Sequence, residues 1–345
     1  MLGCQHIAAA VCFAVLGIVA VLPAQSHAAD FYAGKTLELI VGGAPGGGID
    51  LYARGLSRYF GMHIPGTPAI VVKNMPGASG ARAMQHVYAV APANGLTLVA
   101  IPPGAIIGPL LDEKADKTAD PSKLQYLGTT NAGAGICTTM NTSPTKTFEH
   151  ALQRKTIMGA QGPGALTYDI GYLVQKVTGA QYSIVTGYNG SSHLLLAMER
   201  GEIDGMCGWN WSSAKSQKPD WLRDKKLNVI LQTGVGEDEE LTQLGVPPIW
   251  TYITDDDDRK VAEFILAQKG FERPLAVGPK TPIELVAVLR KSFDKTMTDL
   301  QFLADMEKAG LDVAPASGDT VQTLVEAFYA TPKDIVDKGR NAIRP

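Results

Sequence analysis

Short apolar runs alternate with longer amphipathic segments through most of the chain. The run Leu37–Val41 leads into the glycine-rich stretch Gly42–Gly48, and a helical spacing of apolar residues follows it. The same order recurs where Ala69–Lys73 precedes Asn74–Gly80, and a third strand is predicted at Thr97–Ile101. A strand, a glycine-rich turn and a helix in this order are typical of an α/β unit.

A second series with the same pattern begins after residue 155. Strands are predicted at Thr156–Gly159, Tyr182–Val185 and Ile203–Cys207, and a glycine-rich turn follows the first two, while Gly208 follows the third. Ligands bind where the strands of an open α/β sheet end. Two such series therefore predict two lobes whose loops face one another across a cleft.

The first 28 residues have the pattern of an export signal. Ile7–Leu22 is almost wholly apolar or small, and Ser26-His27-Ala28 fits the small-x-small pattern that signal peptidase cuts. The run is shorter than the roughly 20 residues of a membrane-spanning helix. This favours a cleaved signal peptide, residues 1–28, over the alternative of a retained anchor. Export leaves Cys137 and Cys207, which would either pair in an oxidising compartment or stay as buried thiols.

Composition narrows the class of protein. The 345 residues include 31 Lys and Arg and 34 Asp and Glu, a formal net charge of −3, and 45% of them are hydrophobic. This usage excludes a wholly disordered chain. The near-neutral charge argues against a nucleic-acid partner, which attracts a basic surface. The length exceeds that of one compact core and favours two lobes.

The first glycine-rich loop fits an anion better than a nucleotide. Gly43 and Gly48 have the spacing of the nucleotide cradle, but Ile49 and Asp50 stand where it needs a Lys and a Ser or Thr. The dinucleotide pattern also fails, because Leu51 occupies its third glycine position. Backbone N–H groups bared at a helix N-terminus still bind a carboxylate or a phosphate. A tight turn without a ligand is the alternative for this loop by itself.

Neither a hydrolase nor a metal site has a distinctive pattern in the sequence. The segment Gly77–Ala81 approaches the nucleophile-elbow pattern with Ser79 at its centre, but no local pattern pairs Ser79 with any histidine as base. The histidines are scattered, the cysteines lack paired spacing, and Asp255–Asp258 lacks the alternation of a calcium loop. The sequence therefore predicts neither a metal nor a cofactor, and a hydrolase using Ser79 stays as an alternative.

Aromatic residues gather in the second series. Tyr188, Trp209 and Trp211 are expected directly at strand ends, where a ring flanks the flat or aliphatic body of a ligand. Packing in the core or at the rim is the alternative for any one of them.

Several segments together resemble one family. They are "IVGGAPGGGIDLYAR" at 40–54, "NMPGASG" at 74–80, "APANGLTLV" at 91–99, "GYNGSSHLLLAMERGEIDG" at 187–205, "RPLAVGPKTP" at 273–282 and "AGLDVAPASG" at 309–318. In this order, and over essentially the whole chain after the leader, they are similar to the substrate-binding proteins of tripartite tricarboxylate transporters, the Bug-type receptors.

The resemblance implies a periplasmic solute-binding protein without catalysis. Its two lobes would close on a small organic carboxylate and deliver it to the inner-membrane permease subunits of such a transporter. A receptor that signals through a sensor protein is a further alternative. Carried over by position, the implied ligand-binding residues are Ala44, Gly46, Gly47, Asp50 and Ser79 in the first lobe, and Gly164, Ala165, Thr167, Tyr188, Asn189, Gly190, Ser191 and Trp209 in the second.

The second lobe departs from the family pattern at two positions. The usual Ser is Ala165 and the usual His is Tyr168, so Thr167 is left as the candidate hydroxyl. The predicted loops also lack Arg and Lys, which argues against a ligand that needs several ion pairs. The identity of the carboxylate stays open.

The predicted fold class is α/β, with the type II architecture of periplasmic binding proteins: two α/β lobes, a hinge and a ligand cleft between the lobes. Residues 30–128 and 235–345 are expected to form the first lobe and residues 129–234 the second, so that two chain crossings make the hinge.

Overall fold

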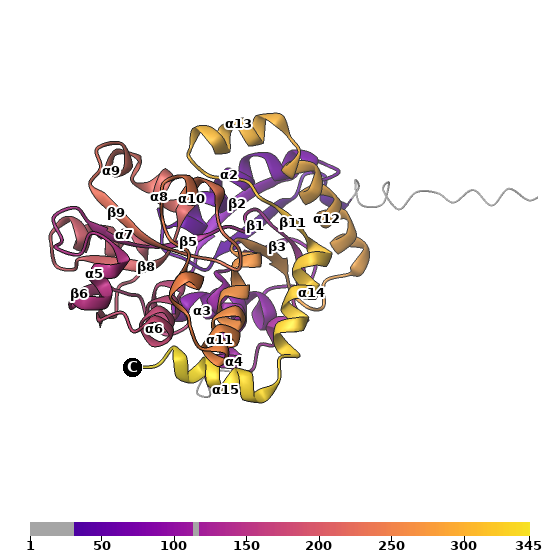
Figure 1. Cartoon of the computed structure of the whole chain (residues 1–345). Coiled ribbons are helices and arrows are strands. Elements are labelled where there is room, and N and C mark those ends of the chain that lie inside the picture. The colour runs from indigo at the N-terminus through magenta and orange to yellow at the C-terminus, as the bar shows by residue number, and fades with distance from the viewer. Residues whose placement is uncertain (1–30, 113–116) are drawn as a thin grey trace, which may run out of the picture.

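Two separate sheets organise the protein, each covered by helices (Figure 1). The structure is a computed structural model that describes residues 31–112 and 117–345. The predicted signal peptide lies outside the described residues. Within those two ranges, no helix combines the length and the apolar character needed to cross a membrane.

The first sheet has six strands in the order β11-β4-β10-β3-β1-β2. Strand β1 pairs in parallel with β2 and β3, whereas β10 runs antiparallel between β3 and β4. The second sheet has five strands in the order β7-β6-β8-β5-β9, in which β6 pairs in parallel with β7 and β8, and β5 runs antiparallel to β8 and β9. The strands are β1 Thr36–Val41, β2 Ala69–Asn74, β3 Thr97–Ala100, β4 Gln125–Thr129, β5 Gly135–Met140, β6 Thr156–Gly159, β7 Tyr182–Val185, β8 Gly205–Asn210, β9 Leu227–Thr233, β10 Pro274–Val277 and β11 Ala316–Ser317.

Helices follow most of the strands. In chain order they are α2 Gly48–His63, α3 Ala81–Gln85, α4 Pro103–Leu111, α5 Phe148–Gln153, α6 Leu166–Thr178, α7 Ser191–Glu199, α8 Trp211–Gln217, α9 Pro219–Arg223, α10 Glu239–Gln243, α11 Asp256–Leu266, α12 Ile283–Met297, α13 Leu300–Lys308, α14 Gly318–Tyr329 and α15 Lys333–Ala342.

The second half of strand β1, Leu39–Val41, is wholly apolar because both of its faces are covered there, whereas Glu38 is partly exposed. Leu39 and Val41 belong to the core that also contains residues of α2 and α12, while Ile40 belongs to the core on the other face. A parallel strand buried on both sides reads as a continuous apolar run. Helix starts are also visible in the sequence: the carboxylate of Asp299 accepts the N–H groups of Gln301 and Phe302 at the start of α13.

The chain passes from the first sheet to the second between β4 and β5, and it returns between β9 and β10. After β9, Leu241 and Val246 still pack in the core of the second sheet. Gln232 and Pro248 also form an isolated bridge. These contacts support a later return than residue 234, and we propose that the second lobe extends from residue 129 to about residue 253.

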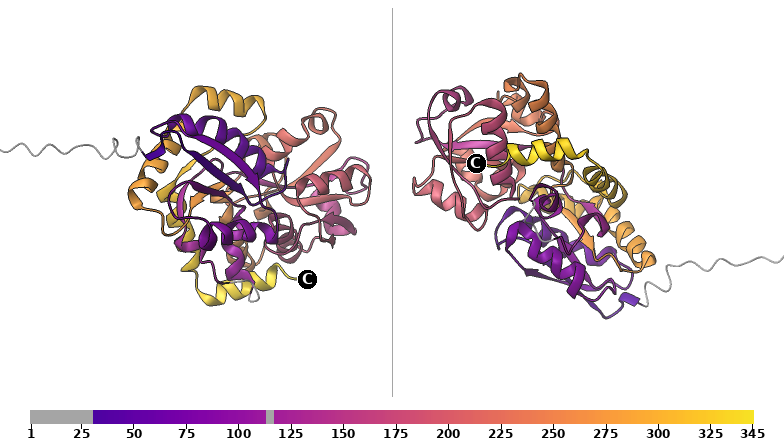
Figure 2. Two further views of the ribbon diagram at one scale, coloured as in Figure 1. Left: turned by 180° about the vertical axis from the view of Figure 1, so that it is seen from behind. Right: turned by 90° about the horizontal axis from the view of Figure 1, so that it is seen from below.

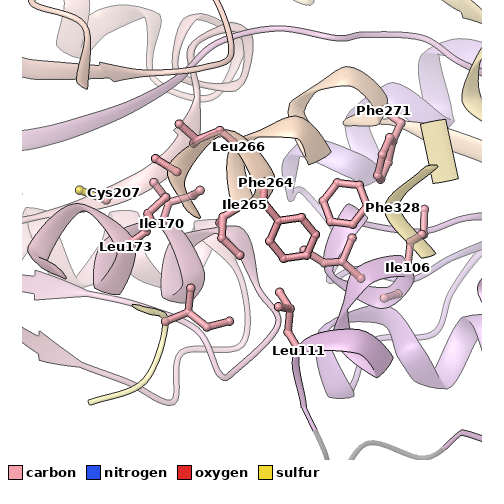
Figure 3. Close-up of a cluster of buried hydrophobic side chains, with 14 of the residues drawn as sticks. Ile106, Leu111, Ile170, Leu173, Cys207, Phe264, Ile265, Leu266, Phe271 and Phe328 are labelled. Carbon is pink, nitrogen blue, oxygen red and sulfur yellow. The ribbon is translucent and has the colours of Figure 1, made fainter. Parts of the chain in front are cut away.

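One apolar cluster continues from the first lobe into the second (Figure 3). Ile106 of α4 comes from the first lobe and Ile170 of α6 from the second, and Phe264 of α11 and Phe328 of α14 lie in the same cluster. Seen from below, α15 reaches from the first lobe to the second (Figure 2), and it contacts α4, α6 and α11. The lobes are therefore joined by packed side chains as well as by the two crossings.

A disulfide joins Cys137 of β5 to Cys207 of β8. This decides between the two alternatives that the sequence left open. The bond ties the crossing strand β5 to the centre of the second sheet, and both cysteines are buried.

Removing this bond is expected to destabilise the protein. The cysteines are separated by 70 residues, and closing a loop of that length stabilises the folded state by about 4 kcal/mol. In urea titrations, the free energy of unfolding of the double variant Cys137→Ala, Cys207→Ala should be about 4 kcal/mol lower than that of the wild type. A reductant should destabilise the wild type and leave the variant unchanged; equal stability with and without the bond would contradict the prediction.

Candidate functional site

A cavity of about 780 Å³ lies between the two lobes. The first lobe contributes the loops after β1 and β2, and the second lobe contributes the loops after β6 and β7 and the end of β8. Ten of the predicted site residues line it: Ala44, Gly47, Ser79, Ala165, Thr167, Tyr188, Asn189, Gly190, Ser191 and Trp209.

Two predicted residues, Gly46 and Asp50, instead lie outside the cavity lining. The N–H of Gly46 donates to the Asp50 carboxylate at 2.9 Å, and that carboxylate also accepts from Arg54 Nε at 3.0 Å and from Asn74 Nδ2 at 2.8 Å. Asp50 is 2% exposed. Burial by itself would raise the pKa of Asp50, but the hydrogen bonds from Arg54, Gly46 and Asn74 hold it below its ordinary value. Asp50 therefore fixes the shape of the loop from beneath.

The second lobe repeats this arrangement without the cation. The N–H of Gly164 donates to Asp169 Oδ1 at 3.1 Å, and Leu173 stands four residues later where the first lobe has Arg54. Asp169 is fully buried, and its Oδ2 has no hydrogen-bond partner among the described residues. Burial raises the pKa of Asp169 to about 7, and the single bond from Gly164 offsets only part of that effect.

The lobes touch at both rims of the cavity. Gln217 Nε2 of the second lobe donates to the Gly46 carbonyl at 2.8 Å, and Ser79 Oγ of the first lobe donates to the Pro163 carbonyl at 2.9 Å. Close by, a Cβ on Gly104 would lie 1.4 Å from the Gly164 carbonyl oxygen, so only glycine allows this approach. We call these contacts the rim contacts. They join the two lobes on either side of the cavity.

The aromatic residues differ in their placement. Trp209 lies inside β8, opposite Ile136 of β5, rather than after the strand as expected. Its indole still lines the cavity and donates to Gln217 Oε1 at 3.0 Å. Tyr188 lines the cavity as well, whereas Trp211 is buried and bonds Glu240. Trp211 therefore packs in the core.

The loop after β6 uses its hydroxyl internally. Thr167 Oγ1 accepts the N–H of Gln161 at 3.0 Å and thereby ties the two ends of the loop together. Gly164, which was also predicted to bind ligand, lines a different pocket. That second pocket has a volume of about 360 Å³ and lies between the lobes beyond the Ser79 contact, with Met84, Tyr168 and Asp169 in its walls.

Sequence reasoning missed Arg273. It lies directly before β10, and its side chain lines the cavity although it is only 7% exposed. Arg273 Nη2 donates to Ser213 Oγ at 2.9 Å, and Nη1 donates to the Glu272 carbonyl at 3.0 Å. Arg273 begins the family-like segment 273–282, but the sequence gives no sign that a residue so far along the chain reaches the glycine-rich loops.

No family model matches the chain, and no curated protein matches it either. Solved structures do match. The Rhodopseudomonas palustris protein MatC with bound malate is 18% identical, with a TM-score of 0.67, over 88% of this chain and 99% of that one. The chain has the fold of periplasmic solute-binding proteins.

Two further structures agree with MatC. An R. palustris protein solved with adipate is 19% identical, with a TM-score of 0.69, over 89% of this chain and 98% of that one. The periplasmic binding protein BugD is 18% identical, with a TM-score of 0.68, over 90% of this chain and 98% of that one. The predicted two-lobe α/β fold is thereby confirmed.

Replacing the two loop aspartates should have opposite pH dependence. Asp50 is ionised in the folded protein, so Asp50→Asn should destabilise it at neutral pH, and the deficit should shrink as the pH falls below about 4. Asp169 stays protonated up to about pH 7, whereas in the unfolded chain it ionises near about pH 4. The stability of the wild type therefore falls across this interval.

The stability of Asp169→Asn relative to the wild type should accordingly rise between about pH 4 and 7, by on the order of 4 kcal/mol. Urea unfolding at pH 4.5, 6 and 8 measures both trends. Parallel pH profiles for the wild type and Asp169→Asn would refute the assignment.

Proposed function

We propose that the protein is a periplasmic receptor that captures a small organic carboxylate and passes it to a tripartite tricarboxylate-type transporter. The cavity between the two lobes is the observation that carries this proposal. Its walls are glycine-rich loops in the order that the motifs of this family predict. The similar folds solved with malate and with adipate support the same class of ligand.

Helix N-termini make the cavity suited to an anion. Helix α2 starts at Gly48, α7 at Ser191 and α6 at Leu166, and each of these residues lines the cavity. The first N–H groups of a helix have no partner within the helix, and the helix dipole adds positive potential there. A carboxylate that bridges the lobes would receive such donors from both sides, so its binding favours the closed state.

The location and the delivery step belong to the same proposal. The predicted signal peptide and the disulfide between Cys137 and Cys207 both fit an oxidising compartment outside the cytoplasm. The permease subunits are inferred from the motif resemblance. A receptor that signals through a sensor protein would bind its ligand in the same way. Uptake measurements in cells would distinguish this signalling role from the transport role.

The serine hydrolase alternative gains no support. The hydroxyl of Ser79 donates to the Pro163 carbonyl, whereas a nucleophile needs a base that accepts its proton. Ser79 contributes instead to the rim contacts. Ser79→Ala should weaken ligand binding by a few fold, and no ester should be turned over by either protein.

Binding is tested by thermal shift with malate, adipate, benzoate and citrate, and with glucose as a neutral control. A ligand that binds only the folded state raises the melting temperature. We expect at least one acid to give a concentration-dependent rise and glucose to give none. A flat response to every acid, confirmed by calorimetry, would overturn the proposed function.

Gly47→Val should abolish binding while the protein still folds. Gly47 has an ordinary φ of −74°, so a side chain brings no backbone strain. Its Cβ would lie 3.1 Å from the Ala44 carbonyl oxygen and 3.9 Å from Ser191 Oγ across the cavity. The remaining methyl groups of valine would then hold the lobes apart.

Gly236→Val is the matched control, because Gly236 is exposed and a Cβ there meets nothing within 4 Å. Calorimetry should show wild-type affinity in the control and loss of binding in Gly47→Val. Unchanged affinity in Gly47→Val would show that the loop does not face the ligand.

A further inference from the structure

Arg273 is the one permanently charged side chain among the described residues that line the cavity. The other lining residues are neutral, apart from the titratable His193. A cation that is more than nine-tenths buried costs free energy unless an anion compensates it. The compensation must therefore come from a neighbouring carboxylate or from the ligand.

The neighbouring carboxylates are already engaged. Glu272 is fully buried and bonds Lys269, which also donates to Asn210 Oδ1 at 2.7 Å. This pair sums to zero charge whether it is ionic or has transferred its proton. Asp50 is held by Arg54, and Asp312 and Glu240 both pair with Lys215, at 2.9 and 2.7 Å. Among the described residues, no carboxylate forms an ion pair with Arg273, so a ligand carboxylate is the partner that its guanidinium lacks.

The guanidinium is held rigidly against the first turn of α2. Its two terminal nitrogens donate hydrogen bonds to Ser213 Oγ and to the Glu272 carbonyl. The centre of the Tyr52 ring lies 5.0 Å from the central carbon of the guanidinium. A Cβ on Gly48 would lie 3.1 Å from Nη2, so the missing side chain leaves the guanidinium beside the N–H groups of the helix. Arg273 Nε has no hydrogen-bond partner in the described part of the chain.

We propose that Arg273 anchors the ligand through a single carboxylate, which it binds together with the first turn of α2. This inference rests on the proposed function and makes it more specific. The site binds acids that present one carboxylate to Arg273. The uncharged remainder of the ligand packs against Ile49, Tyr188 and Trp209. A second carboxylate would meet amides, hydroxyls and His193 but no second Arg or Lys among the described lining residues, and it is not required.

The geometry also gives Arg273 a place at the hinge. Its N–H donates to Thr129 Oγ1 at 3.0 Å, and its carbonyl accepts from Thr130 N–H at 3.4 Å. Ser213 belongs to the second lobe and Gly48 to the first. A carboxylate on this side chain is therefore bound where both lobes and both crossings meet.

The test compares acids with their amides by calorimetry. Adipate is measured beside its monoamide and its diamide, benzoate beside benzamide, and malate beside malamide. The proteins are the wild type, Arg273→Gln, Arg273→Lys and the control Arg223→Gln, whose exposed side chain pairs with Asp224 away from the cavity. Melting curves verify that each variant folds.

For the acid that the wild type binds, Arg273→Gln should lose about 30-fold or more in affinity. The preference for the acid over its uncharged amide should largely disappear, which a merely structural role would not cause. If adipate is bound, its monoamide should bind the wild type nearly as well as adipate does. The control should behave as the wild type.

Folded Arg273→Gln that keeps both the affinity and the acid preference overturns the inference, while acid binding by the wild type preserves the proposed function. If Arg273→Gln does not fold, Arg273→Lys tests the inference, because lysine keeps the positive charge but cannot bind a carboxylate through two N–H groups at once. It should bind the acid about tenfold more weakly and still reject the amide; unchanged affinity overturns the inference. A wild type that binds no acid overturns both proposals.

Discussion

The two segments that carry the chain between the lobes are hydrogen-bonded to each other. Thr129 pairs with Pro274 as β4 meets β10, and Thr129 and Thr130 both bond the backbone of Arg273. Because these segments are joined, the lobes share one pivot rather than two independent linkers. The facing of the glycine-rich loops, the cavity between them and the position of Arg273 all depend on this pairing.

Contacts between the lobes differ greatly in kind from one side of the cavity to the other. Behind the pivot, α11 and α15 bridge the lobes within a continuous apolar core. At the cavity, the rim contacts include hydrogen bonds from Gln217 and Ser79, each worth about 0.5–1.5 kcal/mol net. The rim contacts therefore join the lobes more weakly than the packed side does. Binding of a ligand to both lobes, as proposed, would favour the arrangement in which these contacts are formed.

Local patterns predicted much of the fold. The alternation of strands and glycine-rich turns gave both βα series, and the loops that follow them line the cavity as expected. Strands β4, β5 and β10 were not predicted, because their pairing depends on segments far apart in the chain. Trp209 was misplaced for a similar reason: pairing with β5 extends β8 beyond the point where the glycine suggested an end.

The site shows the same division. Glycine spacing located the loops, but the engagement of Asp50 by Arg54 and Asn74 depends on a partner in another strand. Asp169 looks like any helix-start aspartate until its burial without a cation is seen. Arg273 is brought to the cavity only by the return crossing, which no local pattern reveals.

The bond between Cys137 and Cys207 has a consequence for how the protein matures. The cytoplasm keeps thiols reduced, so a chain exported as proposed forms this disulfide only after it leaves the cytoplasm. Until then, β5 is held against β8 by backbone pairing and packing alone. Under the proposed export, the chain would therefore be easier to unfold before translocation than after it, and oxidation would then make the assembly of the second lobe difficult to reverse.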